Sequence, residues 1–192
     1  MKISEIQELE KKYLISTYIR YPVIFSKGKG VYLYDLQGNK YLDFLSGIAV
    51  CGLGHCHPKV VNALRNQARK LIHTSNLYYT LPQIKLAKLL SQITDGMKVF
   101  FCNSGAEANE GAIKLARKWG KEKNKYEIIT AFNSFHGRTL AAITATAQEK
   151  YQKGFEPLVP GFKYVPFNDI KAIKETIDEK TVAVMLECIQ GE

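Results

Sequence analysis

The 192-residue sequence has no continuous apolar run that approaches the roughly 20 residues needed to cross a bilayer as a helix. Its amino-terminal stretch carries Glu5, Glu8 and Glu10 among lysines and lacks the apolar core of a secretory signal peptide. These absences exclude a protein built on membrane-spanning helices. We expect a soluble, cytoplasmic protein without a membrane partner.

Cysteine is also scarce, and its four positions are scattered rather than spaced as in a disulfide framework: Cys51, Cys56, Cys102 and Cys188. Such usage favours reduced thiols and a reducing compartment. The segment 51–58, CGLGHCHP, resembles a metal cluster. However, three consecutive residues cannot comfortably fill three tetrahedral positions, and no second ligand pair at CxxC or HxxxH spacing follows. We expect no metal site there, but a glycine-rich turn that ends where Pro58 begins a helix.

Two nucleotide-binding loops are missing as well, because no GxGxxG follows a strand and no GxxxxGK[ST] occurs. Acidic residues number 18 against 27 basic ones, which gives a formal net charge of +9. That charge suits nucleic acid, an anionic membrane surface or small acidic ligands. Because the basic residues are spread along the chain without interleaved aromatics, we expect small anionic ligands and no nucleic-acid partner.

The amino-terminal half contains helical and hairpin patterns. Residues 3–13 are predicted to be helical, and 31–47 to form a hairpin around the turn 37–39. Apolar residues recur at helical spacing in 58–72 and 81–93, which predicts two amphipathic helices.

From residue 98 strands and helices alternate, in the predicted order strand 98–102, helix 105–119, strand 127–132, strand 163–166, helix 169–178 and strand 181–187. Strands separated by helices imply parallel pairing with helices on both faces of the sheet. The expected fold class is therefore α/β, with a three-layer αβα architecture and a mainly parallel sheet. Such sheets bind ligands beyond the carboxyl ends of their strands.

Three unusual segments follow predicted strands and should share that edge: CNSGAEA, NSFHGRT at 133–139, and ECIQGE at 187–192. In the first, Ser104 and Glu107 form a capping-box pattern that predicts a helix start at Gly105. The N–H groups of Gly105 and Ala106 would then form an anion seat. An ordinary capped helix with no ligand is the alternative.

In the second segment Phe135 and His136 offer flat faces beside Arg138, whose guanidinium can grip a carboxylate by two hydrogen bonds. Alternatively, Phe135 belongs to the core and Arg138 is a surface cation. The third segment supplies Glu187 and Glu192, which can act as an acid/base pair, orient a cofactor or pair with a basic residue. Together the segments indicate a flat phosphorylated cofactor and an amino-acid-like substrate.

Six motifs stand in the order found in one enzyme family: YLDFLSGIAV, LGHCHP, HTSNLYY, FFCNSGAEANE, FHGRT and IQGE. Over essentially the whole chain the sequence resembles the subgroup III aminotransferases that use pyridoxal phosphate, and within them the acetylornithine and ornithine group. The resemblance implies fold type I. It also implies that 1–50 is a helix and hairpin segment of a small domain and that 51–192 is the incomplete first part of the cofactor-binding large domain.

The same resemblance implies roles for individual residues. Those expected at the cofactor are Ser104, Gly105 and Ala106 at its phosphate, Phe135 stacked on its ring, His136 beside it, and Glu187 nearby. Those expected at the substrate are Arg138 at its α-carboxylate, Tyr18, and Glu192. In the family Glu192 corresponds to a glutamate that pairs with an arginine further along.

The implied reaction passes the terminal amino group of N-acetylornithine through pyridoxal phosphate to 2-oxoglutarate, in arginine biosynthesis, by a homodimer. The family's lysine that binds the cofactor, and its pyridinium aspartate, lie beyond the position of Glu192. We therefore assign no catalytic residue and expect an amino-terminal part that is inactive alone. The alternatives are ornithine, succinylornithine or 4-aminobutyrate as donor, or a non-catalytic module for cofactor binding or assembly.

Overall fold

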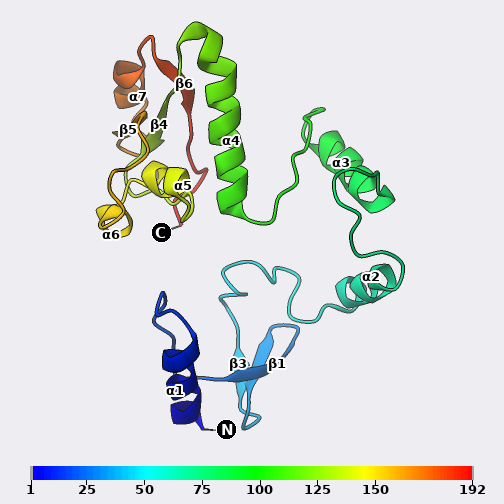
Figure 1. Cartoon of the computed structure of the whole chain (residues 1–192). Helices are drawn as coiled ribbons and strands as arrows, with labels where there is room; N and C mark the ends of the chain where they lie inside the picture. Colours follow the sequence, from blue (N-terminus) through cyan, green and yellow to red (C-terminus); the bar gives the residue numbers. More distant parts are fainter. Residues whose placement is uncertain (1, 192) are drawn as a thin grey trace. The chain divides into compact units, whose positions relative to one another are not determined.

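The computed structural model describes residues 2–191, and the chain divides into two compact units, residues 1–81 and 82–192 (Figure 1). The domain boundary expected after residue 50 stays a prediction. No helix in the described part of the chain is both long and apolar enough to cross a membrane.

The first unit contains a three-stranded antiparallel sheet and two helices. Its elements are α1 (Ile3–Tyr13), β1 (Phe25–Lys29), β2 (Tyr32–Asp35), β3 (Lys40–Leu42) and α2 (Pro58–Ala68). Strand β2 pairs antiparallel with both β1 and β3, which confirms the predicted hairpin. The buried carboxylate of Asp35 holds its turn by accepting the N–H groups of Gln37 at 3.0 Å and Asn39 at 2.8 Å.

The segment 51–58 is a turn anchored to the hairpin. Gly30 and His55 exchange backbone hydrogen bonds of 2.9 and 2.7 Å, and His55 Nε2 lies 2.6 Å from Asp43 Oδ2. Helix α2 then begins at Pro58, as predicted. The four cysteines are free thiols, and within residues 2–191 no group of His, Cys, Asp or Glu is arranged to hold a metal ion.

The second unit is built around a parallel sheet with strand order β5-β4-β6. Its elements, with α3 starting at the unit boundary, are α3 (Leu81–Ile93), α4 (Gly105–Gly120), the 3-10 turn η1 (Lys121–Lys123), β4 (Glu127–Ala131), α5 (Leu140–Ala145), α6 (Glu149–Gln152), β5 (Phe162–Val165), α7 (Ile170–Thr176) and β6 (Thr181–Val184). Helices separate the successive strands, as the sequence pattern predicts.

The central strand β4 is buried on both faces. Ile128 and Ile129 point to opposite faces because side chains alternate along a strand, yet they are only 1% and 0% exposed. Ile128 clusters with Ile113 of α4 and Ala145 of α5, while α7 contacts β5. Figure 1 shows α4 and α7 on either side of the sheet. The predicted layering of helices over a parallel sheet is confirmed.

Two parts of this unit differ from the expectation. Residues 98–102, predicted as a strand, have no sheet partner, and Phe100 is 72% exposed. A strand needs a neighbour for its backbone groups, and the three described strands of this sheet pair only among themselves. The irregular segment after β4 contains α5 and α6, whose six and four residues are too few to show helical periodicity.

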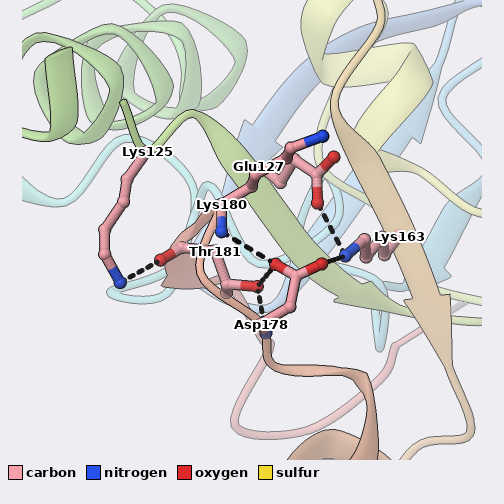
Figure 2. A network of polar contacts seen from close by, with 6 residues as sticks. All are labelled: Lys125, Glu127, Lys163, Asp178, Lys180 and Thr181. Atoms are coloured by element: carbon pink, nitrogen blue, oxygen red, sulfur yellow. Dashed lines mark hydrogen bonds and ion pairs between the residues drawn. The ribbon is translucent and has the colours of Figure 1, made fainter. Parts of the chain in front are cut away.

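An ion-pair network joins the amino-terminal ends of the strands (Figure 2). Lys163 Nζ lies 2.6 Å from Glu127 Oε2 and 2.5 Å from Asp178 Oδ2. Asp178 Oδ1 also accepts hydrogen bonds from Lys180 N and Thr181 Oγ1. The bond from Lys163, helped by the other donors, lowers the pKa of Asp178 to about 2, and Asp178 and Glu127 raise the pKa of Lys163. Lys163 is therefore a charged structural residue.

Candidate active site

The start of α4 is an open helix terminus. The helix begins at Gly105 with Ser104 as its N-cap, as predicted, and Ser104 Oγ accepts the N–H of Glu107 at 3.1 Å. The Glu107 carboxylate instead accepts the N–H of Asn103 at 2.6 Å, so only half of the expected capping box forms. The N–H groups of Gly105 and Ala106 donate to no described residue, and a Cβ at Gly105 would meet no atom within 4 Å. This terminus can receive an anion.

The loop 133–139 lies against the first turns of α4. A Cβ at Gly137 would be 2.8 Å from the Cβ of Ala106, and the φ of Gly137 is +131°, so only glycine fits without strain. Asn109 Nδ2 donates to the carbonyl oxygen of His136 at 2.7 Å. The expected meeting of the first two loops is confirmed.

Glu110, beside Asn109 on α4, fastens the start of α5. Its Oε1 accepts the hydroxyl of Thr139 at 2.6 Å and the N–H groups of Ala141 and Ala142 at 3.2 and 3.4 Å. Sequence reasoning missed both Asn109 and Glu110. Their signal is their spacing of three and four residues from Ala106, which places them on the same helix face.

Glu187 brings the third loop to the same edge. Its Oε2 accepts the N–H of Phe135 at 3.1 Å, and Gln190 Nε2 donates to the carbonyl oxygen of Phe132 at 2.8 Å. Figure 1 shows the first turn of α4, α5 and the segment after β6 at one end of the sheet. The three loops therefore meet at the carboxyl edge of the parallel strands, as the topology predicts.

His136 is buried within the fold, only 5% exposed, and its expected place beside the cofactor stays a prediction. Its backbone N–H donates to Thr146 Oγ1 at 2.7 Å, and its ring Nε2 has no hydrogen-bond partner among the described residues. Burial lowers the pKa of His136, although the charge of Glu187 opposes this shift. The imidazole is therefore neutral at pH 7.

Phe135 and Arg138 lie next to each other, and both contact Tyr151 of α6. The rings of Phe135 and Tyr151 meet edge to face, with centroids 5.9 Å apart at an interplanar angle of 77°. The guanidinium carbon of Arg138 lies 4.1 Å from the Tyr151 centroid and 5.6 Å from that of Phe135. Sequence reasoning missed Tyr151, because nothing local marks a four-residue helix as part of a site.

The contacts within this cluster do not test the substrate roles predicted for Tyr18 and Glu192. Tyr18 belongs to the first unit, where it is 67% exposed and the guanidinium carbon of Arg20 lies 5.8 Å from its ring. Its predicted substrate contact stays a prediction. Glu192 lies outside the described residues, so its role stays a prediction too.

Comparisons with known proteins place these loops in an enzyme family. The model of the family Aminotransferase class-III matches residues 15–192. The acetylornithine aminotransferase of Methanocaldococcus jannaschii is 60% identical over 190 residues, which cover 96% of this chain and 47% of that protein. The chain thus spans about half the length of the curated relatives it matches.

Solved structures agree with the sequence comparison. The ornithine aminotransferase of Toxoplasma gondii ME49 superposes with a TM-score of 0.93 at 32% identity, over 100% of this chain and 47% of that one. The acetylornithine aminotransferase of Elizabethkingia anophelis superposes with a TM-score of 0.81 at 34% identity, over 100% and 46%. The chain therefore belongs to the class-III aminotransferase family.

Proposed function

We propose that this chain supplies the amino-terminal half of an aminotransferase that uses pyridoxal phosphate to move the terminal amino group of N-acetylornithine to 2-oxoglutarate, in arginine biosynthesis. The carrying observation is the meeting of three loops at one sheet edge, where Gly137 packs on Ala106 and Glu187 binds the N–H of Phe135. The 60% identity to the Methanocaldococcus jannaschii enzyme supports the amino donor. The family resemblance supports a cytoplasmic homodimer.

The residues at this edge fit pyridoxal phosphate. The free N–H groups of Gly105 and Ala106 would hold the phosphate. Gly105 has no side chain, and no described atom lies within 4 Å of where its Cβ would be, so the phosphate can approach the backbone. Phe135 would lie against the ring, and Glu187 keeps the Phe135 backbone in place. When bound, the cofactor supplies an electron sink for the carbon that carries the amino group.

Arg138 is the residue of this edge that suits a substrate carboxylate. It is exposed, and its guanidinium carbon lies 4.1 Å from the centre of the Tyr151 ring. A guanidinium that lies flat on an aromatic ring keeps the N–H groups at its edge for two parallel bonds to a carboxylate. Both N-acetylornithine and 2-oxoglutarate carry such a carboxylate.

The test replaces Arg138 in the full-length enzyme, a protein that carries these 192 residues and the carboxy-terminal part present in the relatives. The half-reaction is followed with the donor alone, through the cofactor absorbance. With Arg138→Ala, kcat/KM for N-acetylornithine should fall by roughly 10- to 100-fold, the loss expected for a charge-assisted pair of about 1.5–3 kcal/mol. The half-reaction with N-acetyl-1,4-diaminobutane, which keeps the terminal amino group but has no carboxylate, should change little.

Arg138→Lys is the matched control and should retain part of the activity, because the charge remains but the bidentate geometry is lost. An equal loss with both donors would show that Arg138 does not bind the α-carboxylate. No amino transfer from N-acetylornithine by the unsubstituted enzyme would refute the proposed function.

Ornithine is the second candidate donor, because the Toxoplasma gondii ornithine aminotransferase superposes with a TM-score of 0.93. Comparing kcat/KM for ornithine, succinylornithine, 4-aminobutyrate and N-acetylornithine on one enzyme preparation decides between them. A higher value for ornithine than for N-acetylornithine would replace the first candidate with the second.

A further inference from the structure

We propose that Tyr151 is a positioning residue for Arg138: its ring sets the plane of the guanidinium that receives the substrate carboxylate. This inference rests on the proposed function, because it concerns how that function's substrate is oriented. It assigns a role in the site to α6, a helix that the sequence motifs leave unused.

The contact between the two side chains is close. The Arg138 guanidinium carbon lies 4.1 Å from the centre of the Tyr151 ring, nearer than its 5.6 Å to the Phe135 ring. Arg138 itself is exposed, so without such a surface its long side chain would sample many rotamers. An aromatic face restricts the guanidinium to one plane and consumes none of its hydrogen-bond donors.

Helix α6 is held in place by residues on either side of Tyr151. Gln152 Nε2 donates to the carbonyl oxygens of Thr146 at 2.9 Å and Thr144 at 3.2 Å. Gln148 Nε2 donates to the carbonyl oxygen of Ser134 at 2.9 Å. These bonds tie α6 to α5 and to the loop after β4, so a change of the Tyr151 ring leaves the helix anchored.

Tyr151 also connects the two parts of the site. Phe135 is the residue proposed to lie against the cofactor. The Tyr151 ring meets the Phe135 ring edge to face, with the centroids 5.9 Å apart. The same ring therefore contacts both the aromatic residue for the cofactor and the arginine for the substrate. Lys150 Nζ lies 4.6 Å from the ring as well, so an experiment must separate the effects of Arg138 from those of Lys150.

The test compares two substitutions in the full-length enzyme. Tyr151→Leu removes the aromatic face, and Tyr151→Phe keeps it. We expect Tyr151→Leu to raise KM for N-acetylornithine by roughly 3- to 30-fold, the range for a lost cation–π contact, while kcat changes less than about twofold. Tyr151→Phe keeps the ring beside the guanidinium, so its KM for N-acetylornithine should stay well below that of Tyr151→Leu.

A double substitution separates the effect of Arg138 on KM from that of Lys150. If Tyr151 acts through Arg138, adding Tyr151→Leu to Arg138→Ala should raise KM no further. An additional rise of the same size would overturn the inference. So would a loss of bound cofactor or of thermal stability in Tyr151→Leu, because Tyr151 would then be a packing residue.

The outcomes for the inference and for the proposed function differ. An unchanged KM in Tyr151→Leu, with an active unsubstituted enzyme, overturns the inference and leaves the function standing. An unsubstituted enzyme that transfers no amino group from N-acetylornithine overturns the function, and the inference with it.

Discussion

Gly137 joins the loop after β4 to the start of α4. Its φ of +131° lies in the region that L side chains rarely adopt, and its missing Cβ leaves the space that the Ala106 methyl approaches. Gly154 has a similar positive φ of +89° but open space around it, with no atom within 4 Å of a Cβ. The two glycines therefore separate the effect of backbone strain from the effect of close contact.

Replacing each glycine with alanine should show this difference. Gly137→Ala should lower the free energy of unfolding by about 2–6 kcal/mol, since backbone strain and overpacking each cost about 1–3 kcal/mol. Gly154→Ala should lower it by only about 1 kcal/mol, from strain alone. Denaturant unfolding of the full-length protein measures both, and equal effects would show that the contact with Ala106 is unimportant.

The sequence predicts those site residues that are marked by their immediate neighbours in the chain. Ser104 and Gly105 are recognisable because a capping residue before small side chains marks a helix start. Asn109, Glu110 and Tyr151 were not predicted, since their partners lie elsewhere in the chain. The spacing of Asn109 and Glu110 from Ala106 marks a helix face, but tertiary structure decides which loop packs against that face.

At the scale of elements, helices and strands could be predicted where they are long enough, or buried enough, to show an apolar pattern. Helix α3 (Leu81–Ile93) and strand β4 were predictable because apolar residues recur with a clear period over many positions or in one buried run. The short helices α5 and α6 have too few residues for a period. The run 98–102 has the composition of a strand, but its state depends on a neighbouring strand that composition cannot specify.

The network in Figure 2 ties β4 and β5 to the loop that enters β6, at the end of the sheet opposite the candidate active site. Asp178 accepts hydrogen bonds from Lys163, Lys180 and Thr181, and its pKa of about 2 lies below the ordinary 3.8. A carboxyl group whose pKa is lower in the folded state stabilises that state above its unfolded pKa. The contribution of Asp178 is thus present above about pH 4 and lost as the pH falls toward 2.

Asp178→Asn should therefore lower the free energy of unfolding at pH 7 and flatten its fall between about pH 4 and pH 2. Urea unfolding of the full-length protein at several pH values measures both effects. Glu175→Gln is the matched control, because the Glu175 side chain is 67% exposed and its contact with Lys171 is long, at 3.8 Å. If Asp178→Asn kept the pH dependence of the unsubstituted protein, the network would not carry the acid sensitivity assigned to it.

At the scale of the whole molecule, the residues proposed for the cofactor all lie in the second unit, which follows residue 81. The anion seat on α4, Phe135 and Glu187 are joined there by contacts within one αβα layer structure. Motifs along the sequence predicted this assembly because a parallel sheet brings the carboxyl ends of its strands to one edge. The order of those motifs also identified the family that the comparisons confirm.

The central claim is that the phosphate of pyridoxal phosphate binds the free N–H groups at the start of α4. Gly105→Pro tests it directly, because proline fits the first position of a helix yet removes that N–H. Ser104, at φ −153° and ψ 161°, already has the extended backbone that a following proline requires. The measurement is the dissociation constant of the full-length enzyme for pyridoxal phosphate and for pyridoxal, with and without the substitution.

Gly105→Pro should weaken the binding of pyridoxal phosphate by roughly 10- to 100-fold, the loss expected for one hydrogen bond to a charged group. The binding of pyridoxal, which has no phosphate, should stay within about threefold. Equal weakening of both ligands, or of neither, would contradict the assignment of the phosphate to this helix start.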